Sequence, residues 1–162
     1  MTSEAQKRSP NWLPTPPPIN PAEWVKKCVN ALTLGYVEDM QLHIPLPEGP
    51  EAASVARAKV RGVLAEWNLQ GPVDDLMVIV SELVTNAFRY GQSPIVLHLT
   101  MEDGHIIVGV QDTEPDALPT PQEAKDHEPS GRGLRLISAM ASHWGWEKAG
   151  TQKVVWAQVP DA

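Results

Sequence analysis

The segment 73–90 constrains the fold of this chain more than any other, because its apolar and polar residues recur with the period of a helix. When successive residues are placed about 100° apart, Glu82, Asn86 and Arg89 share a narrow arc with Asp75. The opposite side is broad and apolar, and it consists of Ile79, Val80, Leu83, Val84, Ala87 and Phe88. A helix of this kind lies on the surface of a core. Taken alone, the segment favours a surface helix with a solvated polar face.

The flanking segments predict a layered fold around this helix. Residues 41–46 alternate as a half-buried strand, in which Pro45 favours a sheet edge. The remaining expected elements are a helix at 52–69 with a buried side formed by Val55, Ala58, Val60, Val63, Leu64 and Trp67, strands at 94–101 and 105–111, a helix at 131–143, and strands at 146–148 and 153–159. Helices separate strands only in places. We therefore expect the α/β (α+β) class, a two-layer α/β sandwich with a mixed, mostly antiparallel sheet.

Composition excludes several classes of protein. The chain has 162 residues, and its 13 Lys and Arg against 20 Asp and Glu give a net charge of −7. No basic field exists to attract nucleic acid, so no direct nucleic-acid partner is expected. No apolar run is long enough for a membrane span, and no secretory signal is evident, so we expect a cytoplasmic protein without membrane contact. The single cysteine, Cys28, excludes an internal disulfide and a Cys-rich metal site.

The N-terminal part differs from the rest of the chain. Residues 9–21 contain six prolines, which is typical of an extended leader. Asn20 is a good helix N-cap, and an apolar stripe at helical spacing includes Trp24 and Cys28. We expect a leader and short helix at 1–38, the helix bracing the domain or docking on a partner, and one domain at 39–162.

Other residues suggest a ligand-binding site. Asp112 follows a strand, at a position that commonly faces a ligand pocket. Gly131 and Gly133 open a helix, where backbone N–H groups can approach an anion. The five histidines show no close metal-ligand spacing and are expected on strands or the surface. Cys28 is expected to be a small apolar contact.

In this order, three segments resemble the boxes of the GHKL superfamily, whose Bergerat ATP-binding fold occurs in gyrase, histidine kinases and anti-sigma-factor serine kinases. SELVTNAFRYG at 81–91 is similar to the N-box of the small bacterial anti-sigma-type kinases. VQDTEPDALP at 110–119 and GRGLRLISAMASHWGW at 131–146 are similar to their two glycine boxes, and VVWAQVP at 154–160 to the final strand of actinobacterial members. The resemblance covers about residues 40–160.

The resemblance implies a role for each matched residue. Asn86 matches the Asn that binds the Mg²⁺ bridging the ATP phosphates. This role suits its amide oxygen, since Mg²⁺ prefers hard oxygen ligands. Glu82 matches the general base that activates an attacking hydroxyl or water. Arg89 shares their arc and is a further candidate for binding the nucleotide. Asp112 matches the acid that accepts a hydrogen bond from the adenine amine.

The second glycine box is the expected cradle for the phosphates. Gly131, Arg132, Gly133 and Leu134 match it and would act mainly through backbone N–H groups, and Arg132 could place a cation on the γ-phosphate. Residues 113–130 would then form the ATP lid. The implied activity is transfer of the ATP γ-phosphate to a Ser or Thr of an antagonist protein, together with binding of a sigma factor or similar regulator. Related kinases often dimerise, so a homodimer is also expected.

Two departures from the family pattern keep a second hypothesis open. The first glycine box usually continues Asp-x-Gly-x-Gly, whereas Thr113, Glu114 and Pro115 follow Asp112 here. The final strand of the family usually carries a Thr that helps to hold the adenine. The residue aligned with it here is Val154, unless Thr151 in the preceding turn takes its role. Loss of the glycines removes a close backbone approach. The alternative is therefore a non-catalytic protein-binding module of the same fold, with weak or absent nucleotide binding.

Overall fold

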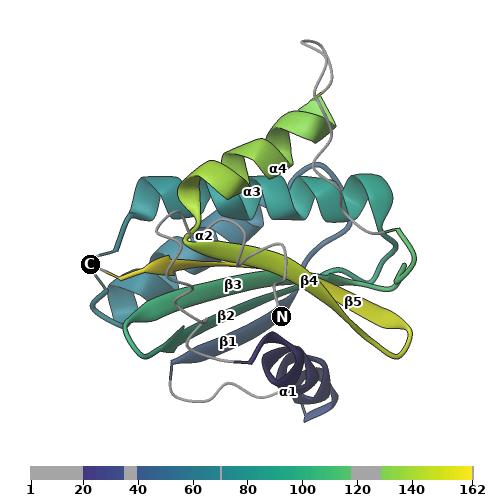
Figure 1. The fold of residues 1–162 in the computed structure, drawn as a ribbon, viewed down its shortest axis with the longest axis horizontal. Coiled ribbons are helices and arrows are strands. Elements are labelled where there is room, and N and C mark those ends of the chain that lie inside the picture. Colours follow the sequence, from purple (N-terminus) through teal and green to yellow (C-terminus); the bar gives the residue numbers. More distant parts are fainter. Residues whose placement is uncertain (1–19, 35–39, 70, 118–128, 162) are drawn as a thin grey trace, which may run out of the picture.

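A computed structural model describes residues 20–34, 40–69, 71–117 and 129–161 (Figure 1). The elements in chain order are α1 (Pro21–Leu34), β1 (Gln41–Pro45), α2 (Ala52–Glu66), α3 (Val73–Tyr90), β2 (Val96–Glu102), β3 (His105–Asp112), α4 (Pro129–Met140), β4 (His143–Ala149) and β5 (Gln152–Pro160). The order of helices and strands is the predicted one. The leader at 1–19 and the central part of the expected lid, 118–128, lie outside the described residues.

The five strands form one sheet in the order β1-β2-β3-β5-β4. Every neighbouring pair is antiparallel, where the sequence predicted a mixed, mostly antiparallel sheet. The reason is that β5 lies between β3 and β4, so the two strands joined through α4 are not neighbours. Positive φ angles at Asp103, Gly104 and Gly150 allow the tight β2–β3 and β4–β5 turns. The predicted α+β sandwich is confirmed.

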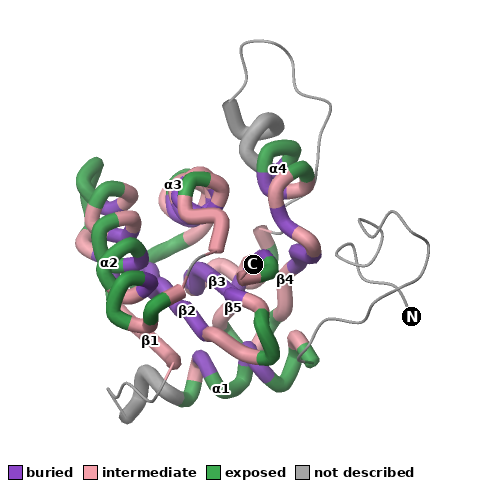
Figure 2. Tube along the Cα trace, turned by 90° about the vertical axis from the view of Figure 1, so that its left-hand side faces the viewer, coloured by how far each residue is buried: buried purple, intermediate pink, exposed green. Residues whose placement is uncertain are grey.

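Strand alternation gives the sheet two different buried faces. Helices α2, α3 and α4 cover one face, and α1 lies on the other (Figures 1 and 2). On β3, Ile106, Val108 and Val110 point into the main core beneath α2–α4. Ile107, the residue between two of them, packs with α1 on the opposite face. Because the side-chain period of a strand is two residues, each strand position belongs to one face only.

Helix α1 braces the sheet, as one of the two sequence interpretations expected. Asn20 caps it, since its Oδ1 accepts hydrogen bonds from the N–H groups of Ala22 at 2.9 Å and Glu23 at 3.3 Å. The Trp24 indole N–H donates to Thr100 Oγ1 on β2 at 3.0 Å. The helix buries Trp24, Val25 and Cys28 against Ile107, Val154 and Trp156. None of the helices within the described residues is both long and apolar enough to cross a membrane.

The buried side of α2 differs in part from the prediction. Val60 and Leu64 are buried as expected, together with Ala52 and Ala56. The expected core residue Ala58 is exposed, because the buried stripe follows a spacing of one residue in four along the helix. Val55, Val63 and Trp67 are half-buried and pack at the margin of the core.

Helix α3 has the predicted bounds and buries the predicted apolar side, with Phe88 half-buried at its edge. It ends at Gly91, whose N–H donates to the carbonyl of Ala87 at 2.8 Å. The backbone of Gly91 is extended, so the glycine is required by space and not by its φ angle. A Cβ at this position would lie 2.5 Å from Asp112 Cγ and 2.7 Å from the Ala87 carbonyl oxygen.

We expect Gly91→Ala to destabilise the fold by about 1–3 kcal/mol, because the added methyl group would overlap the Asp112 carboxyl and the helix backbone. Gly62→Ala on α2 is the matched control. A Cβ there meets no atom within 4 Å, so the greater helix propensity of alanine should stabilise the fold by about 0.5–1 kcal/mol. Urea unfolding of both variants measures the difference, and equal stabilities would contradict the close approach at Gly91.

Candidate functional site

The polar face of α3 carries three of the residues singled out from the sequence. Glu82 and Asn86 are half-buried and stand one helical turn apart, so their side chains lie on the same face. Burial raises the pKa of the Glu82 carboxyl above its ordinary value. Arg89 is exposed near the end of the helix, and its guanidinium carbon is 6.0 Å from the centre of the Tyr90 ring. The helix therefore presents an amide oxygen and a basic carboxylate side by side.

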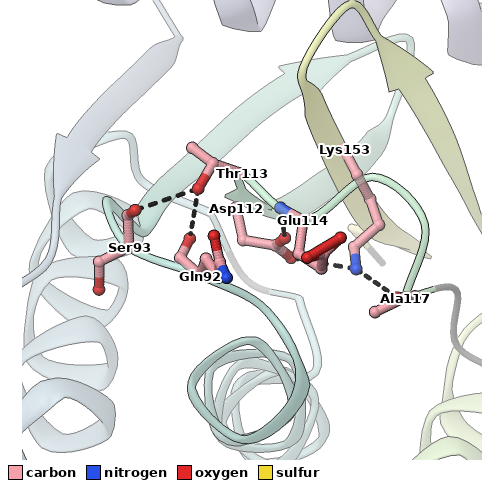
Figure 3. Close-up of polar contacts among 7 residues, drawn as sticks. All are labelled: Gln92, Ser93, Asp112, Thr113, Glu114, Ala117 and Lys153. Carbon is pink, nitrogen blue, oxygen red and sulfur yellow. Dashed lines mark hydrogen bonds and ion pairs between the residues drawn. The ribbon is translucent and has the colours of Figure 1, made fainter.

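Asp112 lies at the end of β3, on the sheet face that α3 covers. Its carboxyl is almost completely buried, and Oδ1 accepts a hydrogen bond from the Glu114 N–H at 2.7 Å (Figure 3). The contact at Gly91 places this carboxyl against the C-terminal end of α3. Asp112 and the end of the N-box segment, 81–91, are thus brought together, although the chain reaches them from separate elements.

The sequence analysis missed Lys153, which forms a buried ion pair with Asp112. Lys153 Nζ is 3.4 Å from Asp112 Oδ2, and both side chains are at most 3% exposed. The same ammonium donates to the carbonyl of Ala117 (Figure 3). Burial raises the pKa of the Asp112 carboxyl, while the Glu114 and Gln92 backbone N–H groups and the Lys153 charge act in the opposite direction. The sequence marks Lys153 only as a basic residue within an apolar strand. Which residue it pairs with depends on the register of β3 and β5.

The pairing of β3 with β5 also shows on which face of the sheet Val154 lies. Lys153 on β5 is paired with Asp112 on β3, and Val154 is paired with Gln111. Val154 is fully buried beside Trp24, on the sheet face that α1 covers. Because strand side chains alternate, Val154 points away from Asp112. Lys153, and not Val154, is therefore the β5 residue that lies beside Asp112.

A loop contact fixes the start of the expected lid. Thr113 Oγ1 donates to the carbonyl oxygens of Gln92 at 3.1 Å and Ser93 at 3.0 Å, and its N–H donates to that of Gln92 at 3.0 Å (Figure 3). The chain therefore leaves β3 along the end of α3. The Thr113 contacts use its side-chain hydroxyl, whereas Glu114, at the first glycine position of the family pattern, contacts Asp112 through its backbone N–H.

The second glycine box lies in the first turn of α4. The helix begins at Pro129, two residues earlier than expected, so the backbones of Gly131, Arg132 and Gly133 are already helical. The first N–H groups of a helix have no partner within it, and they carry the positive end of its dipole. Leu134 is buried in the main core, so its side chain packs there. Because the helix begins at Pro129, Gly133 and Leu134 lie beyond its first four residues, and the expected phosphate-binding role of their N–H groups is not supported. Helix α4 packs against α3.

Together these groups fit part of a nucleotide site. Asn86 offers the hard oxygen that Mg²⁺ accepts, and Glu82 offers a carboxylate that can take a proton. The first turn of α4 offers N–H donors for phosphate oxygens. The Asp112 carboxylate fits an amine donor less simply, because Lys153 and the Glu114 N–H already bind it.

We expect Asp112→Ala to destabilise the fold by about 3–5 kcal/mol, because it leaves the Lys153 ammonium buried without its counter-charge. Asp116→Ala is the matched control, since Asp116 is 88% exposed and its Lys148 contact of 3.6 Å lies in solvent. Thermal unfolding should show a lowered Tm in the first variant and an unchanged Tm in the second. Similar Tm values for the two variants would contradict the importance of the buried pair.

Comparison with known proteins identifies the same part of the chain. Residues 46–159 match the family of the histidine kinase-like ATPase domain. The sensor histidine kinase CpxA of Escherichia coli is 29% identical in an alignment 110 residues long, which covers 56% of this chain and 24% of that protein. The chain therefore spans about a quarter of the length of this relative. The Streptomyces coelicolor protein SCO4941, described as uncharacterized, is 40% identical over 80 residues, which are 47% of this chain and 76% of that protein.

A solved structure has the same fold. The RsbU and RsbW domains of Rv1364c from Mycobacterium tuberculosis superpose with a TM-score of 0.56 at 23% identity, over 74% of this chain and 32% of that one. The predicted resemblance is thus confirmed by sequence and by fold. The family match at residues 46–159 covers β2–β5 and α2–α4 and includes every site residue discussed above. This chain belongs to the family of histidine kinase-like ATPase domains.

Proposed function

We propose that this protein is an ATP-binding regulatory kinase. It binds ATP with Mg²⁺, transfers the γ-phosphate to a Ser or Thr of an antagonist protein, and binds a transcription regulator such as a sigma factor, in a cytoplasmic setting and as a homodimer. One observation carries the proposal. Glu82 and Asn86 are half-buried on one face of α3, inside the matched family region, and α3 packs against α4, the helix that contains Gly131 and Gly133.

The proposed reaction needs few groups from the protein. Asn86 would hold Mg²⁺, which neutralises charge on the phosphate oxygens when it is bound. Glu82 would accept the proton of the attacking hydroxyl while its oxygen bonds to the γ-phosphorus and the bridging bond to ADP breaks. The N–H groups at the start of α4, with Arg132 and Arg89 as further candidates, would hold the phosphates. Their task is mainly positioning and charge stabilisation.

The contacts that Asp112 already makes favour a second candidate function. The adenine amine would have to bind a carboxylate that already accepts the Glu114 N–H and is paired with Lys153. Glu114 and Asp116 also stand where the family pattern Asp-x-Gly-x-Gly has glycines. These features support a protein-binding module that uses nucleotide weakly or not at all. Binding and turnover measurements separate the two candidates.

We expect Mg²⁺-ATP to bind the wild-type protein, and Asn86→Ala to weaken binding by about 10–100-fold and remove its dependence on Mg²⁺, because the metal loses a protein oxygen. Titration calorimetry with and without Mg²⁺ measures both effects. Asn30→Ala is the control, since Asn30 is an exposed residue of α1 on the other side of the sheet. If the wild type gives no heat at several temperatures, the second candidate holds.

We expect Glu82→Gln to lower ATP hydrolysis by about 10²–10⁴-fold while ATP affinity is kept, because the amide cannot accept the proton. Glu147→Gln is the matched control. Burial also raises the pKa of the Glu147 carboxyl. Glu147 follows Trp146 on β4, and Trp146 packs against the core beneath α2–α4. Because strand side chains alternate, Glu147 lies on the sheet face opposite α3.

The pH dependence of the wild type tests the same assignment. The base acts only when ionised, so the rate should rise with pH through the raised pKa of Glu82. The midpoint should lie above the usual glutamate value of about 4.3. Hydrolysis that survives in Glu82→Gln with an unchanged pH profile would exclude Glu82 as the base.

A further inference from the structure

A second polar cluster lies beneath α1, on the sheet face opposite the candidate nucleotide site. It brings together Cys28 from α1, His43 from β1 and His98 from β2. Each offers one ligand atom, the Cys28 sulfur or a ring nitrogen, and these atoms all lie within 4.8 Å of one another. Cys28 and His98 are completely buried, and His43 is half-buried. The three residues are far apart in the sequence, so only the antiparallel register and the docking of α1 assemble them.

Carboxamide groups orient both imidazole rings. His98 Nε2 is 2.8 Å from Gln111 Oε1, and His43 Nε2 is 3.2 Å from Gln41 Oε1. The Gln111 amide is itself fixed, because its Nε2 donates to Gln152 Oε1 at 3.1 Å. An amide oxygen only accepts, so each Nε2 carries the hydrogen in these contacts. The Nδ1 atom of a neutral ring is then unprotonated and presents a lone pair.

These two Nδ1 atoms face each other at 2.8 Å. Two lone pairs at this distance repel, whereas a cation between them is attracted by both. The candidates for that cation are a proton shared by the rings and a metal ion. The Cys28 sulfur beside them favours the metal, because a thiolate and two imidazoles form a usual ligand set for Zn²⁺. Ring nitrogens whose opposite N–H is held by a fixed acceptor are also typical of metal-binding histidines.

The geometry leaves room for the ion and for a further ligand. Around a tetrahedral Zn²⁺, bond lengths of about 2.0–2.3 Å place ligand atoms roughly 3.3–3.6 Å apart. The two Nδ1 atoms would separate by about half an ångström, well within reach of side-chain rotation. A cavity of about 220 Å³ adjoins Cys28 and His43. Its wall includes Glu23 and Glu102, which favour a cation, and Lys27, which opposes one.

We propose that Cys28 Sγ, His43 Nδ1 and His98 Nδ1 bind Zn²⁺, with the fourth coordination position facing this cavity. The metal would tie α1 to β1 and β2, so that docking of the N-terminal helix depends on Zn²⁺. The site is separate from the nucleotide face, and the proposal does not depend on the proposed kinase activity.

The test is titration of the metal-stripped full chain with Zn²⁺ against a chromophoric chelator, and with Co²⁺ as a spectroscopic substitute. We expect one equivalent per chain, a thiolate-to-Co²⁺ charge-transfer band with tetrahedral d–d bands, and a higher Tm with Zn²⁺. Cys28→Ser should lose the charge-transfer band and bind Zn²⁺ at least tenfold more weakly. His105→Gln is the control, because His105 begins β3 and bonds to the Asp103 carbonyl, away from the cluster.

Circular dichroism would confirm that the variants fold. His43→Gln, at a half-buried position on the edge strand, gives the same test if Cys28→Ser does not fold. A folded wild type that binds no Zn²⁺ at micromolar concentration would overturn the proposal and leave a shared proton between the rings. Binding that both variants retain, or that His105→Gln removes, would overturn it as well.

Discussion

The buried ion pair between Asp112 and Lys153 is the interaction on which the candidate site depends. It joins the ends of β3 and β5, and Gly91 allows the end of α3 to rest against it. Two opposite charges in a buried place are stable only while both are present and hydrogen-bonded. The Glu114 N–H and the Ala117 carbonyl supply further hydrogen bonds, so the first residues of the expected lid are held by the same pair. Any ligand that uses the Asp112 carboxylate must therefore act on this pair.

Strand alternation explains why one small sheet can support two unrelated polar sites. Asp112 and Lys153 belong to the face under α2–α4, where α3 adds Glu82 and Asn86. Their sequence neighbours Gln111 and Val154 belong to the face under α1, where Gln111 orients His98. A shift of the register by one residue would exchange these sets, so both sites depend on the same strand pairing. The helix layer and the N-terminal brace thus cover two different polar clusters on a shared sheet.

The sequence predicted the elements well because their signals are local. The period of α3, the cap at Asn20 and the Gly104 and Gly150 turns depend on a few adjacent residues, and the structure contains all of them. The resemblance to the ATPase family also followed from local motifs. The antiparallel order of β3, β5 and β4 was not predicted in full, because strand order depends on contacts between distant segments.

The same limit explains the errors at the two sites. Lys153 was overlooked, and Val154 was considered near the adenine, because the face on which a strand residue lies depends on register and not on composition. His43 and His98 lie on strands as expected, but their meeting across the β1–β2 pair depends on the register and not on spacing along the chain. Cys28 reaches them only through the docking of α1. Local patterns predict elements, and tertiary pairing decides which side chains meet.

The central claim is that the polar face of α3, the Asp112 region and the start of α4 form one nucleotide site. NMR of ¹⁵N-labelled protein during titration with Mg²⁺-ATP tests it most directly, because each amide reports its own surroundings. The account predicts shift changes that centre on Asn86, Gly91 and Gly131, with little change on α1. Absence of shift changes at these residues, or changes confined to the cavity under α1, would contradict it.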